Sequence, residues 1–388
     1  MTANRAFSVF HAGRRAAARG LRALALAAFP AVASLAAAAE TAQLDSSAGP
    51  LRLERMAQGL DTPWALDFLP DGGVLITERG GALKLLRQGR LHAVAGVPRV
   101  VARGQGGLMD VAVARDFAQS REIWLSFARA HPQGGVGTAL AAARLSRDGG
   151  RLRDLRILFQ MAPGDSGGRH FGSRITEAPD GTLFLTLGER GDRPAAQDPA
   201  RHNGKVVRIR RDGSVPPDNP LTGQAGARPE IWSLGHRNPQ GAALDRDGRL
   251  WVVEHGARGG DEVNQIRRGA NYGWPVIAYG RHYSGGRIGE GTAKPGMEQP
   301  AFYWDPSIAP SGLMIYSGRL WPQWAGDFFV GSLKFDLIAR LSGPPLTERE
   351  RIAGPETGRV RDIAEAPDGA IWFISESRGA VYRVTPGG

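Results

Sequence analysis

Two short polar stretches carry side chains suited to catalysis. His170 lies in a glycine-rich segment, and its imidazole, with an ordinary pKa near neutrality, suits a general base, although a structural histidine is the commoner outcome for a residue taken alone. Arg237 and Asn238 follow His236, which no pattern assigns, and precede Pro239. This triplet is either a surface turn or a device that brings one charge and one amide to a ligand.

Three basic residues in the C-terminal part of the chain, Lys334, Arg359 and Arg361, form a second group. Guanidinium groups bind carboxylates and phosphates through paired hydrogen bonds, and a lysine adds a point charge. A ligand with several anionic groups is therefore expected. No glycine-rich stretch matches a phosphate loop or a dinucleotide fingerprint, so a nucleotide cofactor is not expected.

Acidic residues supply the third candidate site. Asp261 and Glu262 adjoin glycines, and their carboxylates are hard oxygen ligands of the kind that Ca²⁺ prefers. The spacing is not that of an EF-hand, so a solvated acidic turn remains an equal alternative.

A repeated sequence unit predicts the secondary-structure elements that position these residues. Short β-type runs flank an Asp-Gly turn, in which glycine tolerates a positive φ, and a polar residue ends the second run. Four clear copies and two degenerate ones place the turn aspartates at Asp71, Asp116, Asp180, Asp247, Asp327 and Asp368. The pattern predicts an all-β fold, a six-bladed β-propeller of four-stranded antiparallel blades, whereas a sandwich would not explain the repetition. Glu78, Glu189, Glu254 and Glu376 recur where the second run ends, either as structural caps or at one convergent site.

Composition indicates a globular chain of 388 residues, 42% hydrophobic and 22% charged. Residues 1–39 contain five arginines, no acid and an alanine-rich apolar run that is too short for a confident membrane span, which predicts a cleaved export signal. Residues 40–50 are expected to be a linker and 51–388 a single propeller domain. The product would be periplasmic or secreted, by the general or the twin-arginine route.

Charge and cysteine content narrow the function classes. The mature chain keeps a formal charge of +6, because five of the arginines lie in the export signal, and its basic residues form no run that predicts nucleic-acid binding. The chain has no cysteine, which excludes disulfides, thiolate metal sites and iron–sulfur clusters.

From Leu51 to Val384 the sequence resembles the soluble aldose sugar dehydrogenases of the glucose/sorbosone dehydrogenase family, which use pyrroloquinoline quinone (PQQ). The motifs that carry the resemblance occur in the family's order: Gly104-Gln-Gly-Gly-Leu108, His170-Phe-Gly-Ser-Arg174, Leu187-Gly-Glu-Arg190, Arg237-Asn-Pro-Gln-Gly241, Glu254-His-Gly256, Gly260-Asp-Glu262 and Asn271-Tyr-Gly-Trp-Pro275.

The resemblance implies a six-bladed propeller with PQQ and Ca²⁺ at one end, and it assigns residues to roles. His170 matches the catalytic base, with Arg237 beside the reacting carbonyl. The residues that match PQQ contacts are Gln105, Arg237, Asn238, Lys334, Arg359 and Arg361. The carbonyls of Gly256 and Ala257 match those that hold the cofactor's Ca²⁺, and Glu262 and Tyr272 match a second, structural Ca²⁺ site.

The implied reaction oxidises an aldose at C1 to an aldonolactone and passes electrons to an external acceptor. The protein is expected to be a monomer or a homodimer and not to be inserted in a membrane. Two departures from the glucose-specific branch put a glucose preference in doubt: Arg169 stands where that branch has an acid, and Arg190 replaces a substrate-binding amide. The alternatives are a Ca²⁺-dependent propeller lactonase, which needs no cationic pocket, and an exported binding propeller.

Overall fold

The recurring Asp-Gly turns connect the first two strands of four of the six sheets in the computed structural model, which describes residues 41–387. In the four clear copies the glycine, such as Gly72 or Gly369, has a φ between +77° and +88°. The preceding aspartate closes the turn in three of them, for example where Asp71 Oδ1 accepts the N–H of Gly73 at 3.0 Å. The four clear turns are therefore confirmed. In the two degenerate copies the connection is longer: Asp116 precedes the short helix Phe117–Ser120, and Asp327 immediately precedes the strand Phe328–Ser332. The predicted export signal, residues 1–39, lies outside the described range.

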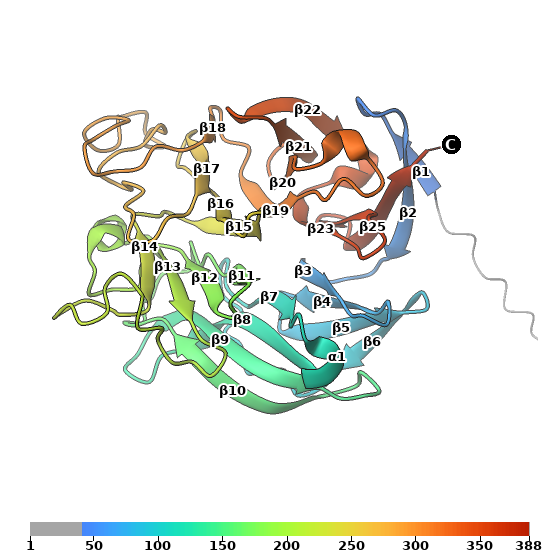
Figure 1. Cartoon of the computed structure of the whole chain (residues 1–388), viewed down its shortest axis with the longest axis horizontal. Coiled ribbons are helices and arrows are strands. Elements are labelled where there is room, and N and C mark those ends of the chain that lie inside the picture. The colour runs from blue at the N-terminus through green and yellow to red at the C-terminus, as the bar shows by residue number, and fades with distance from the viewer. Residues whose placement is uncertain (1–40, 388) are drawn as a thin grey trace, which may run out of the picture. The chain divides into compact units, whose positions relative to one another are not determined.

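Five sheets each contain four consecutive antiparallel strands, and Figure 1 shows the sheets following one another around a ring. Blade 1 contains β3 (Pro63–Phe68), β4 (Val74–Glu78), β5 (Ala82–Arg87) and β6 (Arg90–Val94). Blade 2 contains β7 (Leu108–Val113), β8 (Glu122–Ala130), β9 (Val136–Leu145) and β10 (Leu152–Gln160). Blade 3 contains β11 (Ile175–Glu177), β12 (Leu183–Leu187), β13 (Lys205–Ile209) and β14 (Ile231–Leu234). Blade 4 contains β15 (Pro239–Leu244), β16 (Leu250–Glu254), β17 (Asp261–Gln265) and β18 (Phe302–Trp304). Blade 5 contains β19 (Pro310–Ile315), β20 (Phe328–Ser332), β21 (Leu337–Ser342) and β22 (Thr347–Ala353).

The sixth blade joins the two ends of the described chain. It contains β23 (Val360–Glu365), β24 (Ile371–Ser375) and β25 (Ala380–Pro386), followed outward by β2 (Leu51–Ala57) and β1 (Thr41–Leu44). Pairing of Leu53 with Val384 joins the N-terminal strands to the last blade and so closes the ring. The six-bladed propeller is confirmed, with one blade of five strands. The segment 40–50, which was predicted as a linker, contains β1, and β1 pairs with β2.

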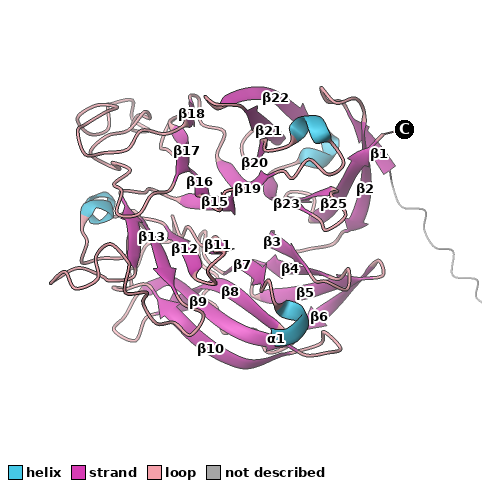
Figure 2. Ribbon diagram, in the orientation of Figure 1, coloured by secondary structure: helices cyan, strands magenta, loops and turns pink. Residues whose placement is uncertain are grey.

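Helix is scarce within residues 41–387, as Figure 2 shows. It is limited to α1 (Phe117–Ser120) and the 3₁₀ turns η1 (Arg193–Gln197), η2 (Pro322–Trp324) and η3 (Pro355–Thr357). No helix in this part of the chain is long and apolar enough to cross a membrane.

The core consists of layers between neighbouring blades. Because successive side chains of a strand point to opposite faces, Leu75 packs between blades 1 and 2 while Ile76 packs between blades 1 and 6. Phe373 and Ile374 of β24 divide in the same way. Both faces of each inner strand are thus buried, which explains the continuous apolar runs after each turn.

Three carboxylates, Asp67 half-buried and Asp110 and Asp362 buried, link the innermost strands near the ring axis. Each accepts a main-chain N–H from the next blade: Asp67 from Val113 at 2.6 Å, Asp110 from Ile175 at 2.7 Å and Asp362 from Leu66 at 3.0 Å. Arg174 lies between two of them, with nitrogens 2.7 Å from Asp110 Oδ1 and 2.9 Å from Asp362 Oδ1. Burial raises the pKa of Asp110 to about 7, against the opposing charge of Arg174. These contacts hold together the innermost strands that support the functional site.

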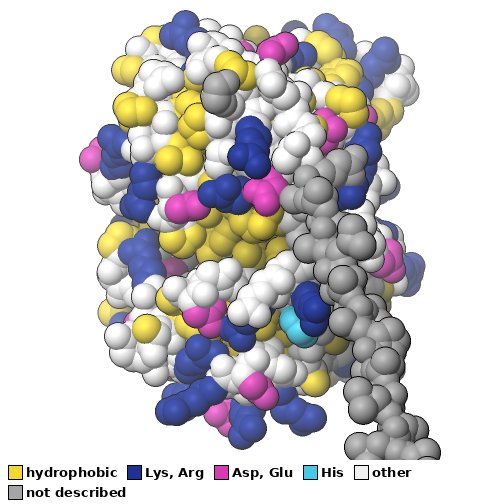
Figure 3. All heavy atoms as spheres, turned by 90° about the vertical axis from the view of Figure 1, so that its right-hand side faces the viewer, with side chains coloured by type: hydrophobic (Ala, Val, Ile, Leu, Met, Phe, Trp, Pro, Cys, Tyr) yellow, Lys and Arg dark blue, Asp and Glu magenta, His cyan; other side chains and the backbone are white. Residues whose placement is uncertain are grey.

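Charge on the surface is mixed. Figure 3 views the side that carries β1, β2 and β25, where Lys and Arg side chains stand in separate groups among acidic and hydrophobic ones. On this face the basic side chains do not gather into one patch.

Candidate active site at one end of the ring

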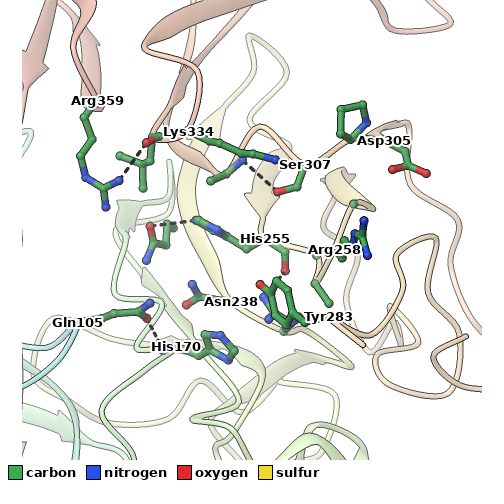
Figure 4. Close-up of a pocket in the computed structure, with 18 of the residues that line it drawn as sticks. Gln105, His170, Asn238, His255, Arg258, Tyr283, Asp305, Ser307, Lys334 and Arg359 are labelled. Carbon is green, nitrogen blue, oxygen red and sulfur yellow. Dashed lines mark hydrogen bonds between the residues drawn. The ribbon is translucent and has the colours of Figure 1, made fainter. Parts of the chain in front are cut away.

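Antiparallel blades send two kinds of connection to the same end of the ring. The Asp-Gly turns lie at one end, so the loops after the second strands and the loops between blades lie at the other. A cavity of about 1070 Å³ opens among these loops. The sequence-predicted residues that line it are Gln105, His170, Arg237, Asn238, Gly256, Ala257, Lys334, Arg359 and Arg361 (Figure 4). Segments separated by more than 200 residues thus meet in one site.

His170 is held in a fixed pose at the edge of this cavity. Its backbone has a φ of +56°, and its N–H donates to Gln105 Oε1 at 2.7 Å. The imidazole Nδ1 forms a short hydrogen bond with Glu189, a carboxylate that is only 1% exposed. Glu189 lies two residues beyond the end of β12 and is one of the recurrent exit acids. The bond to Nδ1 leaves Nε2 as the ring nitrogen available for proton transfer.

Burial is the main influence on the charge state of His170. It lowers the pKa of the imidazole, and the nearby Arg237 charge lowers it further, while the hydrogen bond with Glu189 opposes both. The neutral imidazole, which can accept a proton, is therefore the favoured form near pH 7.

The Arg190 side chain forms hydrogen bonds with the loop that carries His170. Its Nε donates to Asp165 Oδ2 at 3.0 Å and its Nη2 donates to Asp165 Oδ1 at 3.1 Å, a bidentate pair. The remaining donors bond to the carbonyl oxygens of Gly167 and Arg169. Four contacts thus tie residues 165–169 to the turn that also presents Glu189.

This geometry revises the interpretation of Arg190 as a substitute for a substrate-binding amide. Its side chain is 0% exposed, and its guanidinium carbon lies 3.4 Å from the ring centroid of Phe171. Arg190 is absent from the cavities that His170 lines, so it faces the loop and not a bound sugar.

Arg237 and Asn238 enter the cavity from the loop before β15. The N–H of Arg237 donates to Glu254 Oε2 at 2.7 Å, and its Nη1 donates to the carbonyl of His255 at 3.2 Å. Asn238 Oδ1 accepts the N–H of Gly172 at 3.1 Å, which links this loop to the one that bears His170. The triplet is therefore a buried part of the site and not a surface turn.

His236, which the sequence left unassigned, supports this loop from behind. It is fully buried, with Nδ1 2.8 Å from Glu254 Oε1 and Nε2 2.9 Å from Ser233 Oγ. Its ring also stacks on Tyr272 with centroids 4.7 Å apart. His236 thus orients Glu254, which in turn holds the backbone of Arg237.

The opposite wall of the cavity is cationic. Arg359 and Arg361 share Glu376 as an ion-pair partner, with Arg359 Nε 2.9 Å from its Oε1. Arg361 also donates to Gln240 Oε1 at 3.1 Å. Burial acts to raise the pKa of Glu376, but the charges and hydrogen bonds of Arg361 and Arg359 outweigh it and hold that pKa below its usual value. One carboxylate therefore balances only part of the charge of these arginines and of exposed Lys334.

These residues fit a ligand with several carboxylates. Among the residues lining the cavity, seven lysine and arginine side chains face two acids, Asp305 and Glu376. Arg237 Nε is buried and finds no hydrogen-bond partner within residues 41–387, so it presents an unused donor. A polyanion bound here would satisfy that donor and offset the excess positive charge.

A second, small cavity of about 20 Å³ adjoins the first and is lined by Glu262 and Tyr272 as well as by Gly256 and Ala257. Such a volume holds about one water molecule or one ion. Burial first and the charge of neighbouring Glu254 second raise the pKa of Glu262 to about 8, against the opposing hydrogen bond from Asn264. A bound cation would relieve this cost, so the pocket fits a metal ion.

The atoms available to a metal differ from one predicted residue to the next. The Tyr272 hydroxyl donates to the Gln265 carbonyl at 2.5 Å and accepts from Arg267 N at 2.8 Å. The atom of Tyr272 that could coordinate a metal is therefore its main-chain carbonyl oxygen. Asp261, the other acid of the pair, has a structural role: its carboxylate accepts from Gly256 N at 2.8 Å and from Ser307 Oγ at 2.7 Å. Within residues 41–387 no three His, Asp or Glu side chains gather in a metal-binding cluster.

The sequence matches the glucose/sorbosone dehydrogenase family over residues 60–383. The chain belongs to the glucose/sorbosone dehydrogenase family. It is 45% identical over 345 residues to aldose sugar dehydrogenase YliI of Escherichia coli, covering 87% of this chain and 93% of that protein. This membership confirms the resemblance read from the motifs and the predicted enzyme class, a dehydrogenase.

Solved structures of this dehydrogenase family agree with the fold. The apo-form of the soluble aldose sugar dehydrogenase of Escherichia coli superposes with a TM-score of 0.84 at 44% identity, over 87% of this chain and 100% of that one. The PQQ-bound aldose sugar dehydrogenase of Streptomyces coelicolor superposes with a TM-score of 0.72 at 26% identity, over 86% and 98% of the chains.

Several residues of the dehydrogenase site had no definite role assigned from the sequence. Glu189 and Glu376, whose recurrence at the strand exits left open a capping role or one convergent site, contact predicted site residues. His255 and Gln240 line the cavity, with His255 Nε2 3.2 Å from Gln240 Oε1; both belong to the motifs that carry the resemblance, but no role was assigned to them. Tyr283, 71% exposed at the cavity mouth, lies in a loop without any sequence signal.

Proposed function

We propose that this chain is an exported aldose dehydrogenase that depends on PQQ and Ca²⁺ and oxidises the sugar at C1 to an aldonolactone. The observation that carries the proposal is a histidine oriented by a buried carboxylate, His170 with Glu189, that opens on the same cavity as an incompletely balanced cationic wall. A proton acceptor and a polyanion site within one cavity suit cofactor-dependent alcohol oxidation.

The cofactor-binding roles follow from the contacts. Lys334, Arg359 and Arg361 bind the carboxylates of the cofactor, while Gln105 and Asn238 offer amide groups to its polar edge. The carbonyls of Gly256 and Ala257 hold its Ca²⁺, and Glu262 with the main chain of Tyr272 holds a second, structural Ca²⁺. When bound, PQQ supplies an ortho-quinone that accepts a hydride from the anomeric carbon of the sugar.

The chain's own residues manage the proton and the charge. His170 Nε2 accepts the proton of the anomeric hydroxyl as the C1–H bond breaks, and Glu189 stabilises the resulting imidazolium through Nδ1. Arg237 adds a positive charge beside the reaction and lowers the cost of negative charge there. An external acceptor then takes the electrons.

The alternative of a Ca²⁺-dependent lactonase is less well supported. That mechanism requires carboxylates at the centre of the ring that are free to bind the metal. Here the central carboxylates Asp110 and Asp362 are paired with Arg174. A non-enzymatic binding propeller would have no use for the oriented histidine.

Reconstitution tests the proposal. Purified protein stripped of cofactor is titrated with PQQ, with and without Ca²⁺, while dye reduction is followed with a panel of aldoses. Activity that needs both additions supports the proposal, and failure of the folded protein to bind PQQ in the presence of Ca²⁺ refutes it. The N-terminal sequence of the exported protein tests removal of residues 1–39, and sedimentation tests whether it is a monomer or a homodimer.

A further inference from the structure

A side cavity of about 280 Å³ lies next to the large one and shares His170 and Arg237 with it. Its other charged lining residues are Arg169, Arg193 and Glu189. Since it contains His170 and opens at Tyr283, it is the place where the reacting end of a sugar would meet the predicted base. Its lining therefore bears on which sugars the protein accepts.

The carboxylates around this side cavity are already engaged. Glu189 bonds to His170, Asp165 pairs with Arg190, and Asp192 pairs with Arg201 at 2.7 Å. Asp165 and Asp192 thus each pair with another arginine, and Glu189 is the one carboxylate among the described lining residues of the side cavity, against the three charges of Arg169, Arg193 and Arg237.

Neither the Arg169 nor the Arg193 side chain forms an ion pair with a carboxylate within residues 41–387. Arg193 Nη1 lies 3.0 Å from His282 Nδ1, and its guanidinium carbon lies 5.3 Å from the ring centroid of Trp274. Arg169 packs against Gly191, where an added Cβ would lie 2.8 Å from Arg169 Nε. Glycine at that position lets the guanidinium lie close to the backbone, so two positive charges border the cavity without a carboxylate partner.

We infer that the side cavity selects aldoses that carry an anionic group remote from C1, a carboxylate as in uronic acids or a phosphate as in sugar phosphates. The inference rests on the proposed function and specifies its substrate class. Arg169 and Arg193 bind the anionic group by charge-assisted hydrogen bonds, while C1 is presented to His170. A neutral hexose fits the same space without offsetting either charge.

Paired substrates test this on the PQQ-loaded protein. We expect kcat/KM for glucuronate or galacturonate to exceed that for glucose or galactose by about 10-fold or more, as one charged hydrogen bond allows, and to fall as salt is added. Glucose 6-phosphate is the third arm and separates phosphate from carboxylate recognition. Arg169→Gln and Arg193→Gln should each reduce the acidic-to-neutral ratio about 10-fold. Arg90→Gln, which removes an exposed charge from β6, should leave it unchanged.

The outcomes separate this inference from the proposed function. Oxidation of neutral aldoses with no preference for either acidic class, or ratios that the two variants leave unchanged, overturns the inference alone. If no aldose is oxidised, the proposed function fails, and calorimetric titration with glucuronate and glucose then decides about the side cavity. Glucuronate binding that is no tighter than glucose binding, or equally tight in Arg169→Gln, overturns the inference.

Discussion

Replacing Arg190 with lysine tests whether the loop that carries His170 is held by the guanidinium fork. A lysine keeps the positive charge and can reach Asp165, but a single ammonium cannot also bond to the carbonyls of Gly167 and Arg169. Two charge-assisted hydrogen bonds are lost, and at 1.5 kcal/mol or more each the cost is about 3 kcal/mol.

Part of that cost should appear as lower stability and part as a less ordered loop. Displacement of a catalytic group by about 1 Å lowers the rate about 100-fold, so we expect a decrease in kcat of about that size. PQQ affinity should change less than about 2-fold, which corresponds to about 0.4 kcal/mol, because Arg190 does not line the large cavity. The assays are steady-state dye reduction, PQQ titration and urea unfolding.

Arg208 provides a matched control in the same blade. It is a largely buried arginine, 2.7 Å from Asp180 and 3.0 Å from Asp218, beside the Asp-Gly turn at the other end of the ring. Arg208→Lys should lower the free energy of unfolding and leave kcat unchanged. If Arg190→Lys behaves in the same way, or raises the KM for sugar with no effect on kcat, the positioning role is wrong.

Three further predictions concern the proton acceptor, the anion site and the metal. Because burial lowers the pKa of His170, kcat/KM should fall on acidification with a midpoint below about 6.5, and a midpoint above 7 would contradict the depressed pKa. The same depression makes the unfolded chain bind more protons as the pH falls below about 6.5, so His170 lowers stability there. Arg361→Ala should weaken PQQ binding by about 10-fold or more, with activity partly restored by excess cofactor, and wild-type affinity in a fluorescence titration would rule out an anion site at this wall. Removal of Ca²⁺ by a chelator should lower the Tm of the wild type, whereas Glu262→Gln should show little response to the metal; an equal response in both would move the structural metal elsewhere.

The fold was predictable because its strongest signals are local. An Asp-Gly pair between two β-type runs needs only its own neighbours to form a hairpin, and Gly72 and Gly369 adopt the expected positive φ. The addition of β1 to the last blade was less visible, since its pairing with β2 joins residues in a segment of mixed polarity.

The site was predictable only in its list of residues. Gln105 was expected to contact the cofactor, yet its Oε1 accepts the N–H of His170 across 65 residues, a bond that no sequence spacing reveals. Arg190 stands where the glucose-specific branch has a substrate-binding amide, and the sequence did not reveal that its charge is paired with Asp165 in a neighbouring loop. Side-chain direction depends on how loops from different blades meet, and a linear pattern does not contain that information.

The central claim is that His170 takes the sugar's proton in a cavity that separately binds PQQ. Its most direct test is an anaerobic single turnover, in which an aldose is mixed with wild-type protein and with His170→Ala, each loaded with one equivalent of PQQ and Ca²⁺. The account predicts equal PQQ affinity in both proteins, with full reduction of the cofactor in the wild type and none on the same timescale in the variant. Rapid reduction in His170→Ala, or loss of PQQ binding together with loss of reduction, would contradict it.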